Sequence, residues 1–358
     1  MIKKARILAS YLPQFHPIPE NDQWWGKGFT EWTNVGKARP LFKGHYQPKV
    51  PADLGYYDLR IPEIRQAQAD LAGDHGIEGF CYWHYWFGGG KRLLELPFNE
   101  VLLTGKPDFP FCLAWANESW QGFDYGAQGR NILIEQQYPG GPDTENHFYT
   151  ILPALFDKRY IQIDDKPVFM IFRPSQIPDI EQFFDKWQNL ARKNGLNGIF
   201  FIAHTYDATQ MNSLLGKGYD AVNIVRLGDV FKNNNAILTR IKRRVFKGPN
   251  VVNYKEAING LIGQQEQLEN CYPTLIPNWD HTPRTGQKGS ILHNSTPELF
   301  SIHLKQVLDS LKNKQQNHKV IFLKSWNEWA EGNYIEPDIK YGTSYLEIIR
   351  KNIEMNGD

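Results

Sequence analysis

The chain has 358 residues, with 40 Lys and Arg against 39 Asp and Glu and a formal net charge of +1. This balance provides no field that would gather polyanions, so nucleic acid is not expected as a partner. No run of about 18 apolar residues occurs, which excludes a conventional membrane span. The first residues, Met1–Ser10, lack the apolar region and cleavage site of a signal peptide. We therefore expect a soluble, cytoplasmic protein.

Short apolar runs of strand length alternate along the chain with segments that read as helices. Ile61–His75 is amphipathic, Ile180–Asn194 ends before a glycine, and Thr296–Asn313 opens with a Thr cap followed by Pro. Strands that alternate with helices predict parallel βα units. Eight runs predict an α/β protein, a (β/α)8 TIM barrel, formed by one domain over residues 1–358. The runs are Ile7–Tyr11, Gly79–Trp83, Phe111–Trp115, Val168–Phe172, Ile199–Ala203, Ala221–Val225, Thr274–Pro277 and Val320–Ser325.

Two segments depart from this rhythm. Gln14–Ala52 is long for a βα connection and rich in aromatic residues, so we expect an extended first loop that folds over the barrel mouth. Lys232–Lys255 is basic. A solvated helix face is the simpler interpretation of this second segment, and peripheral contact with an anionic membrane or an anionic glycan is the alternative.

The three cysteines, Cys81, Cys112 and Cys271, show no CxxC spacing. Two of them lie inside apolar runs, where a small hydrophobic side chain packs well. We expect all three to be reduced core thiols, as in a cytoplasmic protein.

Polar and aromatic residues follow most of the apolar runs, at the positions where barrel enzymes carry their reactive groups. A buried strand needs none of these polar groups, and burying one unpaired costs roughly 2 kcal/mol or more. Aromatic rings also stack on the apolar faces of sugars. We expect the following residues to bind substrate: His16, Trp32, His84, Trp86, Asn117, Glu118, His204, Tyr206, Asp280, Trp326, Asn327 and Trp329.

The segment Ser325–Pro337 (SWNEWAEGNYIEP) carries the sharpest signal. If Asn327 caps a short helical turn, Glu328 and Glu331 lie on one face with Cβ atoms roughly 5–6 Å apart. Repulsion between two close carboxylates raises one pKa, which leaves an acid beside a base, as glycosidic bond cleavage requires. Both glutamates are therefore predicted catalytic residues. Alternatively, Glu331 is a capping or ion-paired residue and only Glu328 matters, or neither does.

Other residues compete for these roles. Glu118 and Glu31 are acids at a strand end and in the first loop, and either is alternatively a partner for substrate hydroxyls; ordering the loop is a further role for Glu31. No GxSxG motif supports a serine nucleophile. Neither a metal nor another cofactor is expected, because no HxH or HxxxH spacing joins the histidines that would have to form a site, His16, His84, His204 and His281.

Four motifs together resemble the WbsX-type proteins of bacterial surface-polysaccharide gene clusters, which are described as related to glycoside hydrolase family 99. They are Tyr11–Val35 (YLPQFHPIPENDQWWGKGFTEWTNV), Phe80–Phe87 (FCYWHYWF), Ala114–Trp120 (AWANESW) and Ser325–Asp338 (SWNEWAEGNYIEPD). The resemblance runs from the first strand to the last and implies a (β/α)8 barrel that acts on glycans.

In the family 99 endo-α-mannosidases the last motif has the same Glu-x-x-Glu spacing. The resemblance therefore implies that Glu331 is the general acid/base. It also implies that Glu328 assists attack by the neighbouring 2-hydroxyl, through an anhydro-sugar intermediate and with retention of configuration. Ala330 stands where the hydrolases tend to carry His, and the long aromatic loop is a WbsX-type feature.

The leading hypothesis is a retaining glycoside hydrolase or transglycosylase that cleaves glycosidic bonds, α-mannosidic by resemblance, in surface-polysaccharide and O-antigen metabolism. The alternative is a glycosyltransferase of lipopolysaccharide biosynthesis; neither an Asp-x-Asp motif after a strand nor a phosphate loop supports a nucleotide donor. A third hypothesis is a carbohydrate-binding barrel without catalysis, against which the intact glutamate pair weighs. The expected partner is an oligosaccharide or polysaccharide.

Overall fold

The computed structural model describes residues 3–122, 131–233 and 248–354. Its centre is a closed barrel of parallel strands in which β1 pairs with both β2 and β14. The predicted (β/α)8 barrel is confirmed, and each predicted strand overlaps a barrel strand. These strands are β1 (Arg6–Tyr11), β2 (Gly79–Trp86), β4 (Phe111–Trp115), β8 (Lys166–Ile171), β9 (Phe200–Thr205), β10 (Ala221–Ile224), β12 (Cys271–Leu275) and β14 (Val320–Leu323).

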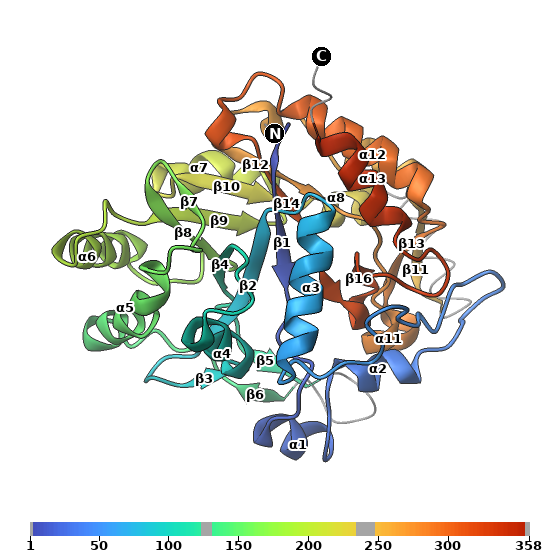
Figure 1. The fold of residues 1–358 in the computed structure, drawn as a ribbon, viewed down its shortest axis with the longest axis horizontal. Helices are drawn as coiled ribbons and strands as arrows, with labels where there is room; N and C mark the ends of the chain where they lie inside the picture. The colour runs from blue at the N-terminus through green and yellow to red at the C-terminus, as the bar shows by residue number, and fades with distance from the viewer. Residues whose placement is uncertain (1–2, 123–130, 234–247, 355–358) are drawn as a thin grey trace.

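Helices surround the barrel (Figure 1). The three predicted helices are confirmed as α3 (Pro62–Asp74), α6 (Ile180–Lys193) and α12 (Pro297–Ser310). The Thr296 hydroxyl caps α12 by accepting a hydrogen bond from the Leu299 N–H, as its place before Pro297 predicts. The other helices of the outer layer are α4 (Leu96–Thr104), α5 (Gly141–Leu155), α7 (Met211–Gly216) and α13 (Ser344–Ile353).

Short strands and helices decorate the loops. The strands form small antiparallel or parallel pairs beside the barrel, and the one pair that matters for the site joins β15 (Asn327–Glu328) to β16 (Asn333–Tyr334). The others are β3 (Arg92–Leu93), β5 (Trp120–Gln121), β6 (Ile132–Ile134), β7 (Gln162–Ile163), β11 (Asn250–Asn253) and β13 (Ser290–His293), with the helices α8 (Leu227–Asn233) and α10 (Tyr254–Ala257).

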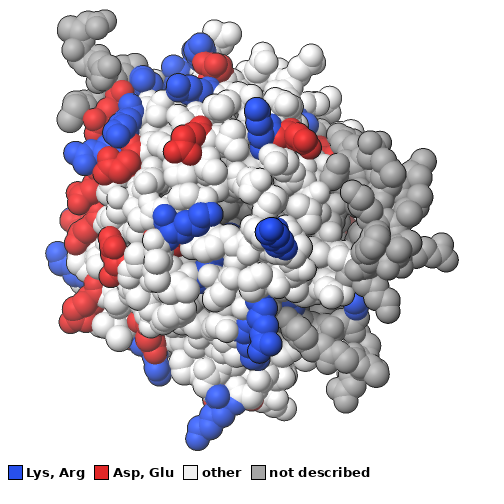
Figure 2. All heavy atoms as spheres, turned by 90° about the vertical axis from the view of Figure 1, so that its right-hand side faces the viewer, with Lys and Arg blue, Asp and Glu red and all other residues white. Residues whose placement is uncertain are grey.

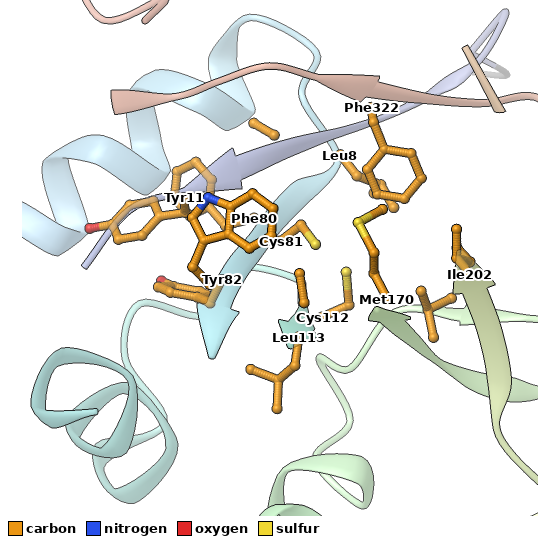
Figure 3. Close-up of a cluster of buried hydrophobic side chains, with 14 of the residues drawn as sticks. Leu8, Tyr11, Phe80, Cys81, Tyr82, Cys112, Leu113, Met170, Ile202 and Phe322 are labelled. Atoms are coloured by element: carbon orange, nitrogen blue, oxygen red, sulfur yellow. The ribbon is translucent and has the colours of Figure 1, made fainter. Parts of the chain in front are cut away.

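The interior of the barrel is layered, because alternate side chains of each strand point inward. Figure 3 shows an apolar layer in which Leu8, Cys81, Cys112, Met170, Ile202 and Phe322 are directed toward one another. The three cysteines are free and buried, which confirms the expected core thiols. Two residues further along the same strands stand Trp83, Phe172, His204 and Lys324, so the next layer is mixed aromatic and polar.

The extended first loop folds over the barrel mouth, as predicted. It contains α1 (Pro19–Trp25) and α2 (Glu31–Lys37), both at the end toward which the arrow of β1 points, and α2 lies beside α11 (Thr282–Thr285) (Figure 1). Trp24 packs edge-on against Trp120 of β5 with ring centroids 5.9 Å apart. Ring contacts of this kind hold the loop over the strand ends.

On the face shown in Figure 2, Asp and Glu gather along the left edge with Lys and Arg among them, and further Lys and Arg stand singly over the centre. The basic cluster within Lys232–Lys255, comprising Arg240, Lys242, Arg243, Arg244 and Lys247, lies outside the described residues. Over the parts of the chain that are described, no helix is both long and apolar enough to cross a membrane.

Candidate active site

A cavity of about 800 Å³ opens at the C-terminal mouth of the barrel, where barrel enzymes hold their substrates. Its size lies within the usual range of ligand pockets. Three kinds of side chain form its wall: the carboxyl groups of Glu31, Glu118, Glu328 and Glu331; the basic groups of Arg173, His281, Arg284 and Lys324; and the rings of Trp25, Trp83, Tyr85, Trp120, Phe172, Tyr206 and Trp279.

Glu328 lies deep in this cavity, on β15, which follows β14 along the chain, and is 5% exposed. The indole Nε1–H of Trp83 donates to its Oε1 at 2.8 Å, and the Lys324 ammonium donates to its Oε2 at 3.4 Å. Burial raises the pKa of Glu328, the Lys324 charge opposes that rise, and the adjacent Glu331 carboxyl adds to it by charge and by hydrogen bonding. The side chain is therefore held in place but poorly disposed to carry a charge.

Glu331 ends the 3₁₀ turn Trp329–Glu331, and its side chain is 16% exposed. Arg284 Nη1 donates to its Oε1 at 2.5 Å, and the same guanidinium reaches Glu31 Oε2 at 2.9 Å. His281 Nε2 lies 3.8 Å from Glu331 Oε1. Burial, together with the Arg284 charge, lowers the pKa of His281 to about 4, so this imidazole is neutral near pH 7. Arg284 is thus the cation that faces Glu331.

The local structure of the glutamate pair differs from the predicted helical turn. Asn327 does not cap that turn; its side chain bonds both backbone groups of Leu12, accepting from the N–H at 2.7 Å and donating to the carbonyl at 3.0 Å. Asn327 and Glu328 belong to β15, and the Ser325 hydroxyl accepts the Glu328 N–H at 3.0 Å. The hairpin still directs both carboxyl groups into one cavity.

Among the predicted substrate-binding residues, Glu118 and Tyr206 line the cavity. Glu118 forms an ion pair with Arg173 at 2.7 Å, in which the side chains are 41% and 37% exposed. The Arg173 guanidinium lies over the Phe172 ring, 4.4 Å from its centroid, and 5.9 Å from that of Tyr206. This side of the cavity therefore offers hydrogen-bond donors, acceptors and ring faces together.

His84 and Trp86 lie on the outer face of β2, away from the cavity. His84 Nε2 contacts His147 Nε2 of α5 at 2.9 Å, and the Trp86 ring stacks on the His147 ring with centroids 4.7 Å apart. Burial lowers the pKa of His84 to about 3. The reason is strand alternation: Trp83 and Tyr85 point inward, so their neighbours point outward and fasten a helix to the barrel.

The two tryptophans of the last motif that were predicted to bind substrate, Trp326 and Trp329, are buried in the protein. Trp329 is 1% exposed, stacks on Tyr334 with ring centroids 3.7 Å apart and donates its Nε1–H to Glu336 at 2.6 Å. Trp326 is fully buried with its ring centroid 5.2 Å from that of Phe80. Both rings serve packing beneath the site rather than its wall.

Five further predicted residues lie outside the cavity wall, Trp32 half-buried and the other four buried, and each is bonded to the protein. Trp32 donates to the Tyr57 carbonyl at 2.8 Å, and Asn117 holds the backbone of Arg173. The other contacts are those of His16 with the Pro13 carbonyl, of His204 with Asn223, and of Asp280 with His45, Gln47 and Thr282. These contacts order the loops and the polar layer that support the cavity.

Sequence reasoning missed two cations at the centre of the site. Lys324 is a single charged residue at the end of an apolar run, four residues before Glu328. A lone charge in that position could have identified it as a site residue. Arg284 lies in the one-turn helix α11, where the local sequence, HTPRTG, has no distinguishing pattern. Among the described residues, no group of three or more His, Cys, Asp or Glu side chains is arranged to hold a metal ion.

The mouth of the barrel brings paired carboxyl groups together beneath aromatic rings, an arrangement typical of enzymes that act on carbohydrate. A family model described as "Glycosyltransferase WbsX" matches residues 7–349, and the chain belongs to that family. Two curated relatives, both named "Uncharacterized protein WxcX" and from two strains of Xanthomonas campestris pv. campestris, are 35% identical over 349 residues. The match covers 97% of this chain and 49% of each relative, so the chain spans about half of their length.

Solved structures share the fold at low sequence identity. A "Glycoside hydrolase-like protein" aligns with a TM-score of 0.61 and 14% identity, over 98% of this chain and 94% of its own. The glycoside hydrolase family 99 endo-α-mannosidase of Bacteroides thetaiotaomicron aligns with a TM-score of 0.58 and 16% identity, over 97% and 96%. These likenesses establish the barrel architecture.

Proposed function

We propose that the chain is a retaining glycoside hydrolase or transglycosylase of surface-polysaccharide and O-antigen metabolism. The observation that carries the proposal is the convergence of Glu328 and Glu331 in one aromatic-walled cavity, with unequal surroundings. One carboxyl group is buried and fixed by two donors, and the other faces the open space. Cleavage of a glycosidic bond needs such a division between proton donor and base.

The proposed roles follow the resemblance to family 99. Glu331 protonates the departing glycosidic oxygen while the substrate's 2-hydroxyl oxygen attacks the anomeric carbon and gives its proton to Glu328. Water, or an acceptor hydroxyl in a transglycosylase, then gives a proton to Glu331 and opens the anhydro-sugar, and Glu328 returns its proton to the 2-hydroxyl oxygen. Trp83 and Lys324 support the part of Glu328, because both donors stabilise the carboxylate that it must present when the 2-hydroxyl attacks.

The cavity wall supports a sugar ligand. Trp25, Tyr85 and Trp120 offer ring faces for sugar C–H groups, and the exposed Glu118–Arg173 pair offers acceptors and donors for hydroxyls. Structural similarity to an enzyme named an endo-α-mannosidase makes α-mannosides the first substrates to try. We assign the activity to a single barrel domain in the cytoplasm, where the free thiols of the core would stay reduced.

The family's description favours a second candidate, a glycosyltransferase. A nucleotide or lipid-diphosphate donor needs cations free to meet its phosphates. In the described wall of the cavity, Arg173, Arg284 and Lys324 each already contact a carboxyl group. A diphosphate would have to break one of these pairs, which is why bond cleavage is the preferred proposal.

The deciding experiment incubates the purified chain with manno-oligosaccharides, with the polysaccharide of the producing organism and with sugar nucleotides, and follows released sugar against released nucleotide. Released reducing sugar whose first-formed anomer keeps the substrate's configuration is the expected result. Nucleotide release without sugar release would instead establish the transferase. The Glu331→Gln variant, treated identically, controls for contaminating enzymes.

A further inference from the structure

Arg284 lies between two carboxyl groups that come from opposite ends of the chain. Its Nη1 donates to Glu331 Oε1 at 2.5 Å, and its Nη2 and Nε lie 2.9 Å and 3.3 Å from Glu31 Oε2. The side chains of Arg284 and Glu31 are 13% and 2% exposed. Because Glu31 begins α2 in the first loop, this contact ties the loop directly to the catalytic pair.

A count of charges favours one proton on the three carboxyl groups of the site. Glu31, Glu328 and Glu331 provide three carboxyl groups, whereas Arg284 and Lys324 provide two positive charges, so full ionisation would leave one uncompensated buried negative charge. Such a charge is costly. Glu328 and Glu331 line the same cavity, and the Glu331 carboxyl raises the pKa of Glu328, which favours one proton between the two groups.

The geometry assigns that proton to Glu328 in the free protein. Charge-assisted N–H···O contacts normally measure about 2.7–2.9 Å. The Lys324–Glu328 contact, at 3.4 Å, is longer than this, whereas Arg284 contacts Glu331 directly, so Glu331 has the stronger counter-charge. Burial also raises the pKa of Glu328. Before substrate enters, we therefore place the proton on Glu328 and not on the proposed acid, Glu331.

We infer that Arg284 is a positioning residue that controls where this proton lies, and that Glu31 is the carboxylate that takes Arg284 away from Glu331. As Arg284 turns wholly to Glu31, the O–H bond at Glu328 breaks and an O–H bond forms at Glu331. Glu328 then carries the charge beside Lys324 and Trp83, and the total charge of the site is unchanged. The catalytic meaning rests on the proposed function, whereas the movement of the proton does not.

The other groups that face the pair do not supply or remove a charge near neutral pH. His281, from the loop before α11, is neutral because burial lowers its pKa to about 4. The phenols of Tyr85 and Tyr206, on β2 and just after β9, have pKa values raised by burial. Trp83 carries no charge, so Arg284, Lys324 and Glu31 are the charges that act on the pair.

The test is a ¹³C NMR titration of the whole chain labelled at glutamate side-chain carboxyl carbons, which needs no substrate. Arg284→Met removes the charge but keeps the chain length, and we expect the apparent pKa values of the Glu328–Glu331 pair to rise by roughly one to three pH units. Glu31→Gln leaves Arg284 to Glu331 alone, and the lower apparent pKa of the pair should fall. The matched control is Glu78→Gln, which breaks the Arg6–Glu78 ion pair, of 2.7 Å, at the opposite end of the barrel.

Activity gives a second readout on any glycan that the wild-type chain cleaves. Glu31→Gln should lower kcat at least about tenfold with little change in KM and move the alkaline limb of the pH profile to lower pH, because a held Arg284 keeps Glu331 ionised. Glu31→Asp, which keeps the charge, should restore part of the rate. Thermal unfolding checks that each variant is folded. If Arg284→Met is not folded, the Glu31→Gln variant by itself tests the inference.

The outcomes separate the two proposals. Titrations of Arg284→Met and Glu31→Gln that coincide with that of the wild type would overturn the inference, even if Glu331→Gln is inactive. A shifted titration together with an active Glu331→Gln enzyme would support the placement of the proton and refute the assigned catalytic role.

Discussion

The carboxyl groups of the last motif, Glu336 on one side and the Glu328–Glu331 pair on the other, have different surroundings. Glu336 is 3% exposed and accepts hydrogen bonds from the Tyr57 hydroxyl at 2.9 Å, the Gln68 amide at 2.6 Å and the Trp329 indole at 2.6 Å. All three donors are neutral, and burial raises the pKa of Glu336 to about 7. A few residues earlier, the Glu328–Glu331 pair meets two cations and an open cavity.

The difference teaches how neighbours divide carboxyl groups between structure and chemistry. Neutral donors fix the orientation of Glu336 and fasten α3 and the first loop to the last motif, but they offer no counter-charge and no path for a substrate. The Glu328–Glu331 pair contacts two cations and borders the cavity. Its proton can therefore move between the two carboxyl groups, and its charge can act on a substrate. The same residue type, at nearly the same depth, thus serves two purposes.

The substitution with the largest expected effect is Glu331→Gln, which tests the chemical role of the pair. We expect turnover to fall by roughly 10²- to 10⁴-fold, because the variant keeps the shape of the side chain but loses the proton donor. Binding of the uncleaved glycan, measured by calorimetry, should survive. Undiminished turnover would remove Glu331 from the acid role.

Removing Trp329, the ring between the two groups, should affect stability instead. Trp329→Ala deletes a buried ring that stacks on Tyr334 and donates to Glu336, and we expect a loss of about 3–5 kcal/mol in the free energy of unfolding, measured with urea. If this variant unfolds like the wild type but binds glycan poorly, Trp329 is a ligand contact and its packing role is wrong.

The pH dependence of the free energy of unfolding tests the structural role of Glu336. Between pH 4.5, the ordinary pKa of a glutamate, and about 7, folded Glu336 keeps a proton that the unfolded chain has lost, so stability falls as pH rises through this window. The full effect is about 3 kcal/mol. Glu336→Gln cannot titrate, and unfolding measured at several pH values should show a shallower decline. An equally steep decline in the variant would assign the slope to other groups.

The smallest expected effect is at the cavity wall. Trp25→Ala removes a ring of the first loop that packs on Phe29, with centroids 5.9 Å apart, and lines the cavity. Glycan binding should weaken by about 0.5–1.5 kcal/mol, with stability nearly unchanged. Calorimetry and thermal unfolding measure the two quantities, and an unaltered affinity would place the sugar elsewhere in the cavity.

The inward and outward faces of β2 could not be told apart from the sequence. The β2 sequence, GFCYWHYW, is apolar or aromatic at almost every position, so nothing in it tells the inward face from the outward one. Its register against β1 and β4 turns Trp83 and Tyr85 toward the cavity and His84 and Trp86 toward α5. Strand alternation therefore decided which of the residues predicted at strand ends reach the cavity and which point away from it.

By itself, the sequence determined the barrel, the aromatic first loop and the Glu328–Glu331 pair, because apolar runs, turn residues and close spacing are local patterns. Only the tertiary structure decided which charges surround the pair. Arg284 lies 47 residues before Glu331 and Glu31 a further 253 before Arg284, and no local pattern links them. The strength of a charge pair depends on distance and burial, and both exist only once the chain has folded.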